Sequence, residues 1–98
     1  MTITLSSRAR RDLQSIANHI EKDNPARAIS FVGELRDTIK RLAEIPRAFP
    51  LVPRYEQHGI RRRSHKGYGI LYSVEQHGIF VHRILGPGQD HDAALQLN

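Results

Sequence analysis

Two amphipathic helices joined by a very short connection are the feature of this sequence that most limits its fold. In the first helix, apolar side chains recur every three or four positions, at Ala9, Leu13, Ile16, Ala17 and Ile20. A second stripe of the same period contains Ala28, Phe31, Val32, Leu35, Ile39 and Leu42. Only Asp23-Asn24-Pro25 separates the two, which predicts an antiparallel helical hairpin. Gly33 in the second helix suggests a close approach of the helices there.

Polar residues and prolines mark the expected ends of both helices. The serine pair at positions 6–7 offers a hydroxyl oxygen to the free backbone N–H groups at the start of the first helix. Asn24 is expected to cap the second helix, with Pro25 at its first position, where a missing N–H costs nothing. The second helix is expected to run to about Glu44, because Pro46 stops it.

Segments with the pattern of β-strands flank the hairpin on both sides. Thr2–Leu5 alternates β-branched and apolar residues, as is typical of a short strand. After an ordered, extended connection that contains three prolines, three strands are expected, at residues 60–66, 68–75 and 79–85. The turn at 76–78 is so short that the last two strands must be antiparallel. The tail either forms one helical turn at 93–95 or frays, and all 98 residues are expected to form one domain.

The amino-acid composition limits which binding partners and which cellular location are expected for the protein. Fifteen Lys and Arg residues against ten Asp and Glu give a net charge of +5, which favours nucleic acid or an acidic protein, although such a charge also serves solubility alone. The absence of cysteine excludes disulfides and thiolate metal sites, and fits a cytoplasmic location. No apolar run approaches the roughly 20 residues of a membrane span, and the N-terminus lacks a signal peptide pattern, so no membrane association is expected.

The densest basic segment of the chain predicts contact with phosphate or with an acidic partner. Arg61, Arg62, Arg63 and His65 fall on the first of the three consecutive strands, and Arg83 on the last. Strand alternation puts Arg61, Arg63 and His65 on one face. Arg62 takes the other face. Because unpaired buried charge is costly, these side chains either bind phosphate or carboxylate groups, or form a solvated strand edge that repels other strands.

Catalysis by this chain would be that of a metal-independent ribonuclease, which needs a base, an acid and cations to stabilise the developing charge. The candidate cations are Arg61, Arg63 and Arg83. The candidates for proton transfer are His65, His82 and His91. Alternation predicts that His82 and Arg83 point to opposite faces. Nothing in the spacing fixes their geometry, so no catalytic residue is assigned, and the histidines have no metal-ligand spacing, so neither a metal nor a cofactor is expected.

A set of residues spread over the helices and strands matches a known family pattern. The first helix carries Ala9-x-x-Asp12-Leu13-x-x-Ile16, and the second carries Ala28-x-x-Phe31-x-x-x-Leu35-x-x-x-Ile39-x-x-Leu42-x-x-x-Pro46. The strands carry Ile60-Arg61-Arg62, Tyr72-x-Val74 and Arg83-Ile84-Leu85. Together with the order of the elements, these residues resemble the ParE branch of the ParE/RelE superfamily, the small toxins of bacterial type II toxin–antitoxin operons.

This resemblance implies a fold, a function and a set of partners. The implied fold is α+β with the order β-α-α-β-β-β, in which the helical hairpin packs on one face of a small antiparallel sheet. The implied function is that of a plasmid stabilization toxin, which inhibits DNA gyrase by protein–protein contact, without catalysis, and arrests growth. The implied partner is a cognate acidic antitoxin that neutralises the toxin in a hetero-oligomer and through which alone operator DNA is contacted.

Two other functions stay open at the level of sequence. One is a RelE-like, ribosome-dependent mRNA endonuclease, and the other is a weakly toxic basic module that acts mainly in an antitoxin and operator complex. RelE-type nucleases carry a tyrosine or histidine close to the C-terminus, whereas no tyrosine follows Tyr72 here. ParE-like chains often have Leu-His and a basic residue where this one has Leu85-Gly86-Pro87-Gly88-Gln89-Asp90, so no C-terminal functional residue is transferred. Arg61 matches the strand arginine of the family and is expected to matter more than its two neighbours.

Overall fold

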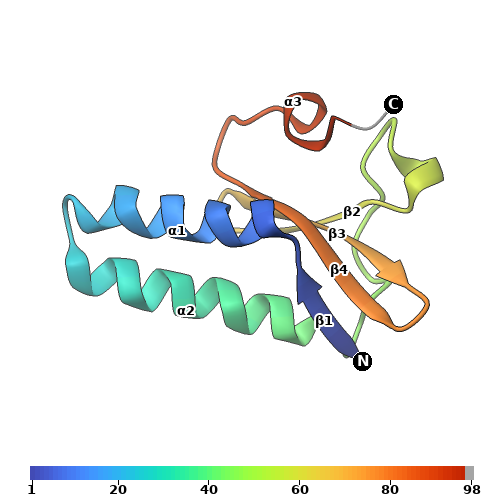
Figure 1. Ribbon diagram of the computed structural model, residues 1–98, viewed down its shortest axis with the longest axis horizontal. Coiled ribbons are helices and arrows are strands. Elements are labelled where there is room, and N and C mark those ends of the chain that lie inside the picture. Colours follow the sequence, from blue (N-terminus) through green and yellow to red (C-terminus); the bar gives the residue numbers. More distant parts are fainter. Residues whose placement is uncertain (97–98) are drawn as a thin grey trace.

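A computed structural model describes residues 1–96 of the chain (Figure 1). Its elements are β1 (Thr2–Leu5), α1 (Ser7–Glu21), α2 (Pro25–Arg41), β2 (Arg61–His65), β3 (Tyr68–Glu75), β4 (Gly78–Leu85) and α3 (His91–Leu95), with a short 3-10 turn at Glu56–His58. The expected α+β order β-α-α-β-β-β is therefore confirmed, and α3 supplies the last helical turn. No helix among these residues is long and apolar enough to span a membrane.

The four strands form one sheet in the order β1-β4-β3-β2. The pairs β2–β3 and β3–β4 are antiparallel, as expected, whereas β1 lies parallel to β4. After the hairpin the chain enters the sheet at the opposite edge, as β2, and two antiparallel connections then bring β4 beside β1. The first and last strands are thus neighbours.

Apolar layers cover both faces of the sheet. The α1–α2 hairpin packs on one face, where Leu13, Phe31 and Leu35 meet Tyr72 and Val81. The other face is covered in part by α3 and by the connection that follows α2, through the buried residues Val52, Tyr55, Ile60, Leu71, Leu85, Ala94 and Leu95. Figure 1 shows the far end of the hairpin projecting beyond the sheet, with α3 lying on the other side.

The helix ends follow the local sequence closely. Ser6 caps α1, since its Oγ accepts a hydrogen bond from the backbone N–H of Ala9 over 2.9 Å, and Asn24 caps α2 through the N–H of Arg27 over 3.0 Å. The α2 helix ends at Arg41 rather than near Glu44. The three residues after Arg41 form tighter turns, in which each backbone N–H bonds the carbonyl three residues earlier.

Gly33 does not mark a close approach of the helices, and this expectation was wrong. A Cβ atom built at Gly33 would meet no other atom within 4 Å. The glycine therefore leaves open space instead of allowing a helix contact, and it weakens α2 without a packing gain.

A β-bulge in β4 changes which side chains face the helices. Leu71 pairs with Arg83, but the next residue of β3, Tyr72, pairs with Val81, so His82 is an extra residue. Val81 and Ile84 both belong to the core under the hairpin, which strict alternation would forbid. His82 contacts Ser73 and Arg83 contacts the carbonyl of Ala94, so both lie on the α3 side, and the expectation of opposite faces was wrong.

The expected extended connection packs along the outer edge of β2. The N–H of Val52 bonds the carbonyl of Ile60 over 2.8 Å, and the N–H of Arg62 bonds the carbonyl of Pro50 over 3.0 Å. Leu51 forms an isolated bridge with Arg61. The connection therefore covers this strand edge, and charge alone is not what protects it.

Candidate functional site

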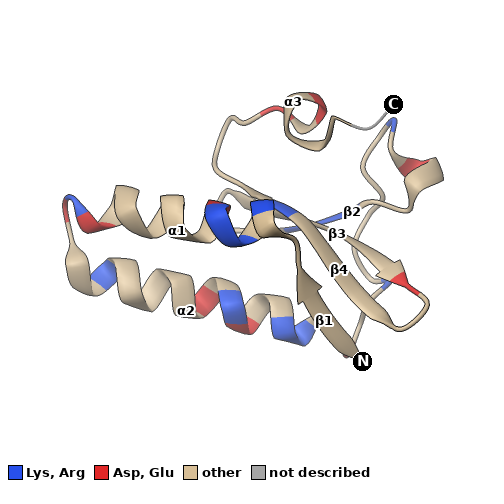
Figure 2. Cartoon of the chain, viewed as in Figure 1, with Lys and Arg blue, Asp and Glu red and all other residues tan. Residues whose placement is uncertain are grey.

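The five residues that the sequence singled out are divided between the two sides of the sheet. Arg61, Arg63 and His65 lie on the side of the α1–α2 hairpin, as alternation along β2 predicts, while Arg62 lies on the α3 side. Arg83 also lies on the α3 side but turns toward α1. Figure 2 shows the same dispersal, with basic residues on α1, α2, β2 and β4. Each local environment must therefore be considered by itself.

Glu34 of α2 is the centre of a cluster that ties this helix to the β2–β3 turn. Its carboxylate forms an ion pair with Arg27, accepts from Lys66 Nζ over 2.9 Å and accepts from His65 Nε2 over 3.0 Å. Phe31 lies beneath this cluster, with its ring centroid 5.0 Å from the Arg27 guanidinium carbon and 5.8 Å from the His65 ring centroid. The hydrogen bonds from Arg27, then Lys66, then His65 lower the pKa of Glu34 from 4.5 to about 2.

We expect this cluster to give the fold an acid-sensitive contribution. Because the pKa of Glu34 is lowered in the folded state, the stability it adds is complete above about pH 4.5 and is lost as pH falls toward 2. Urea unfolding of the wild-type protein and of Glu34→Gln across this range measures the difference. The gap between them should close on acidification. If the difference in unfolding free energy between wild type and Glu34→Gln did not change with pH, Glu34 would not be the acid-sensitive group. The same would follow if Glu44→Gln, at an exposed position, produced an equal difference.

Arg61 and Arg63 hold the connection between α2 and β2 in place. Arg61 Nη1 donates to the carbonyl of Phe49 over 2.7 Å and to that of Arg47 over 3.3 Å. The guanidinium carbon of Arg63 lies 4.8 Å above the centroid of the Phe49 ring. Tyr72 supports the same segment, since its hydroxyl donates to the carbonyl of Pro46 over 2.7 Å, and burial raises its pKa. Arg61 therefore has a structural role.

Arg62 connects β2 to the start of α3. Its Nη1 donates to Nε2 of His91 over 2.8 Å, and its Nε donates to Ser64 Oγ over 3.0 Å. The guanidinium lies over Gly69 so closely that a Cβ there would be 2.4 Å from its central carbon. Because a guanidinium can only donate, Nε2 of His91 is the acceptor in this contact.

Among the ion pairs within residues 1–96, the one between Arg83 and Asp12 of α1 is the most buried. The Nε of Arg83 lies 2.7 Å from Oδ2 and its Nη2 lies 2.9 Å from Oδ1, and the two side chains are only 16% and 15% exposed. The same carboxylate accepts from the backbone N–H of Ile84 over 2.9 Å, and Arg83 Nη1 donates to the carbonyl of Ala94 over 3.0 Å. The contact with Asp12 raises the pKa of Arg83. One guanidinium thus joins α1, β4 and α3.

His82 is held beside Ser73 on the α3 side of the sheet. Its Nε2 lies 2.8 Å from Ser73 Oγ, and its ring is nearly perpendicular to that of Phe80 at a centroid distance of 4.8 Å. Burial lowers the pKa of His82, so the neutral ring is favoured at pH 7.

Sequence reasoning missed the two acidic residues that organise these contacts. Asp12 borders the apolar stripe of α1, and its place in the family pattern was the one signal that pointed to it. Glu34 sits among the core residues of α2 beside Leu35, and nothing in the local spacing distinguishes it from an ordinary surface residue. Both acids bind residues that are distant in sequence, by 71 positions for Asp12–Arg83 and 31 for Glu34–His65.

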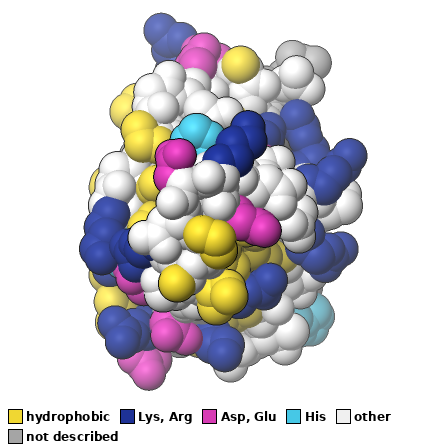
Figure 3. All heavy atoms as spheres, turned by 90° about the vertical axis from the view of Figure 1, so that its left-hand side faces the viewer, with side chains coloured by type: hydrophobic (Ala, Val, Ile, Leu, Met, Phe, Trp, Pro, Cys, Tyr) yellow, Lys and Arg dark blue, Asp and Glu magenta, His cyan; other side chains and the backbone are white. Residues whose placement is uncertain are grey.

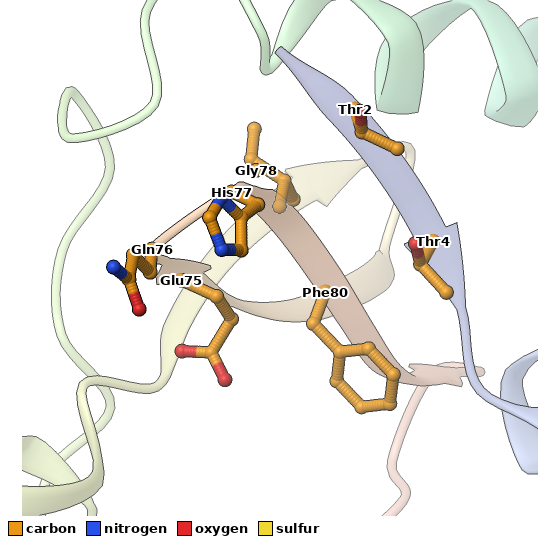
Figure 4. A pocket seen from close by; sticks show the side chains of 8 residues that line it. Thr2, Thr4, Glu75, Gln76, His77, Gly78 and Phe80 are labelled. Atoms are coloured by element: carbon orange, nitrogen blue, oxygen red, sulfur yellow. The ribbon is translucent and has the colours of Figure 1, made fainter.

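The surface of residues 1–96 contains several hollows. One of them, of about 500 Å³ and lined mainly by polar residues, lies where β1 meets the β3–β4 turn, with the Phe80 ring, the Glu75 carboxylate and the His77 ring around it (Figure 4). A second, of about 370 Å³, lies at the free end of the hairpin beside Ile29, where Figure 3 shows hydrophobic side chains gathered. A third, of about 280 Å³, lies between β1 and α2. Within residues 1–96, no three His, Asp or Glu side chains are placed to hold a metal ion.

The chain matches a known protein family and is similar in fold to solved structures. Residues 3–91 match the model of the ParE toxin of the type II toxin–antitoxin system parDE. No protein of curated function has a significant sequence match to the chain. The fold is similar to that of a chain from the chromosomal ParDE system of P. aeruginosa, with a TM-score of 0.75, 20% identity, and coverage of 89% of this chain and 96% of that one.

A second solved structure shares the fold at greater distance. It is a chain of the toxin–antitoxin complex RelBE2 of Mycobacterium tuberculosis, with a TM-score of 0.63, 19% identity, and coverage of 87% of this chain and 95% of that one. Identities this low speak for the fold alone, whereas the family match extends over nearly the whole chain. The chain belongs to the ParE toxin family of type II toxin–antitoxin systems.

Proposed function

We propose that this toxin acts in the cytoplasm by binding DNA gyrase through protein–protein contact, without catalysis by its own side chains, and that a cognate acidic antitoxin neutralises it. The observation that carries the proposal is that the arginines a nuclease would need lie on both sides of the sheet and are engaged in contacts within the fold. Arg61 is bound to backbone carbonyls, Arg63 lies over Phe49, and Arg83 is bound to Asp12. These contacts stabilise the fold and do not converge on one phosphate.

The histidines support the same conclusion. His65 donates to Glu34, on the hairpin side of the sheet. His82 lies beside Ser73 and has a lowered pKa, which makes it a poor acid at pH 7. Nε2 of His91 is occupied by the hydrogen bond that it accepts from Arg62. The three rings lie at three separate places, and an acid and a base are not paired.

The target is tested by two assays on the purified toxin. We expect inhibition of gyrase supercoiling by the wild-type protein and, to within about twofold, by a variant in which His65, His82 and His91 are all glutamine. Primer extension on translated mRNA should show no cuts. A general acid or base contributes roughly 10²-fold or more to a cleavage rate. Loss of toxicity in the triple variant with folding preserved, together with cuts in mRNA by the wild type, would contradict gyrase as the target.

A RelE-like endonuclease is the second candidate, and one contact favours it. Arg62 and His91 place a cation and an imidazole 2.8 Å apart on the α3 side of the sheet. In that case, His91→Gln alone should abolish the mRNA cuts, whereas His65→Gln should leave them. If neither supercoiling nor mRNA responds while the antitoxin complex still forms, the protein is the weakly toxic module instead.

The surface supports binding of an acidic, partly disordered antitoxin segment. The hollow between β1 and α2 is lined by Ile3, Leu5 and Ile39, with Arg36 and Lys40 at its rim. A second apolar surface lies at the free end of the hairpin, where Ile29 is 79% exposed. Alternating apolar and acidic residues on a segment that folds on binding would complement both surfaces. Operator DNA would then be reached through the antitoxin.

Coexpression with the product of an adjoining small acidic reading frame tests the partner. We expect the two chains to purify as a hetero-oligomer, and Arg36→Glu with Lys40→Glu to weaken the complex by tenfold or more, because the rim charges would then repel an acidic segment. The matched control is Arg10→Glu with Arg47→Glu, which makes the same charge change at exposed positions outside the hollow. Equal weakening by both pairs would mean a diffuse charge effect, and a toxin that ignores the neighbouring product would contradict the proposal.

A further inference from the structure

A hollow between the start of α1 and β4 is lined almost entirely by arginine. It has a volume of about 220 Å³, and its lining residues are Arg8, Arg11, Asp12 and Arg83. Three guanidinium groups and one carboxylate give this lining a net charge of +2. The first turn of α1 contains no acidic residue that would reduce the charge further.

Arg83 is held rigidly at the inner side of this hollow. Its Nε and Nη2 donate to Asp12, and its Nη1 donates to the carbonyl of Ala94. A guanidinium has five N–H donors, so two remain on Arg83 after these three hydrogen bonds. Asp12 also accepts from Ile84, so both of its oxygens already accept hydrogen bonds within the fold. The aspartate therefore orients Arg83 while leaving the exposed arginines at positions 8 and 11 without a carboxylate of their own in the hollow.

We propose that this hollow binds a phosphate group, supplied either by the nucleic acid backbone or by a small free phosphate. Forked N–H donors on two or three arginines match the tetrahedral oxygens of phosphate, and a fixed first guanidinium reduces the ordering cost of binding. The sequence suggested phosphate binding by the β2 arginines. The structure instead places the available donors at α1 and β4.

The polarity of the hollow favours phosphate over an acidic peptide. Interfaces with protein segments have an apolar core, and the apolar hollows of this chain lie elsewhere, beside Ile29 and beside Ile39. The arginine hollow has no apolar side chain in its lining. A polar, positive surface of this kind is typical of contact with nucleic acid. The toxin itself would then touch nucleic acid, in addition to any contact made through an antitoxin.

The test uses the free toxin and a 20-base-pair DNA duplex of arbitrary sequence, with binding followed by fluorescence anisotropy at several salt concentrations. The test variant is Arg8→Gln with Arg11→Gln. The control is Arg10→Gln with Arg41→Gln, which removes the same charge at exposed positions outside the hollow. Removing two phosphate contacts should reduce the slope of log affinity against log salt by about 1.8. The control should reduce it by less than half as much.

Inorganic phosphate distinguishes the two sources of the ligand. Titrated into isotope-labelled toxin, it should shift the Nε–Hε signals of Arg83 and Arg11, and it should compete with the duplex if the backbone occupies the hollow. Signal shifts without an effect of the test variant on the duplex would assign the hollow to small phosphates. Equal loss of duplex binding in both double variants, or no response to either ligand, would overturn the proposal. Weakened antitoxin binding by the test variant alone would assign the hollow to an acidic protein. Gyrase inhibition has no part in these readouts.

Discussion

Replacing Asp12 with alanine is expected to lower the free energy of unfolding by about 3 kcal/mol or more. Removing one partner of a buried ion pair leaves the other charge uncompensated, which costs about 3–5 kcal/mol in such pairs. Here the change removes the acceptor of Arg83, whose side chain is only 16% exposed, and also the acceptor of the backbone N–H of Ile84. Three elements lose their common attachment at once. Urea unfolding followed by circular dichroism measures the loss.

Two further variants separate the ion pair from a general effect of losing a carboxylate. Asp37→Ala, at an exposed position of α2, should change stability by no more than about 0.5 kcal/mol. Replacing Asp12 and Arg83 together by apolar residues should cost clearly less than the sum of the two single changes, because neither charge is then left unpaired. Additive losses in the double variant would show that the two side chains do not act as a pair.

The second large effect is expected for Gly78→Ala. Gly78 begins β4, has a φ of 158°, and pairs with Thr2 of the parallel strand β1. A Cβ atom at this position would lie 1.9 Å from the carbonyl oxygen of Thr2, far inside any tolerated contact. Since backbone cannot move aside as a flexible side chain does, β1 must shift away from β4, and we expect a loss of about 3 kcal/mol.

The control for this substitution is Gly33→Ala, which is expected to raise the free energy of unfolding rather than lower it. At Gly33 of α2 an added methyl group meets no atom within 4 Å, so Gly33→Ala should raise stability by up to about 1 kcal/mol through helix propensity. Amide hydrogen exchange locates the effect of Gly78→Ala, because protection should fall first in residues 2–6. A variant that keeps both its stability and the protection of β1 would contradict the close approach.

Local signals in the sequence were sufficient to predict the helices and strands. They were not sufficient to predict how distant strands pair. Ser6, Asn24 and Pro25 set the helix starts, since a cap depends on only a few neighbouring residues. The parallel pairing of β1 with β4 depends on where the chain returns after the hairpin, which no local pattern encodes. The bulge at His82 is likewise invisible to alternation, because alternation assumes that every residue has a partner.

The candidate site was harder to predict than the fold, for a related reason. Clustered arginines on β2 suggested one binding face, yet each of them found a partner from a distant segment, such as the carbonyl of Phe49 for Arg61 and His91 for Arg62. A cluster of arginines in the sequence shows that these side chains need hydrogen-bond or ionic partners. It does not show whether the partners belong to the same chain or to another molecule. The arginine hollow is the opposite case, since Arg8 and Arg83 are 75 positions apart in the sequence and become neighbours because α1 packs beside β4.

Because the first strand pairs with the last, the sheet of this protein can form only late in synthesis. The α1–α2 hairpin has all its residues early, but β1 has no neighbour until residues 78–81 have been made, and Asp12 waits for Arg83. Long-range pairing of this kind forms late in folding. A ribosome-bound chain therefore carries a helical hairpin whose sheet-facing side is still uncovered. Any property that depends on the closed sheet therefore develops only after residues 78–83 have been made and have paired with the N-terminal part of the chain.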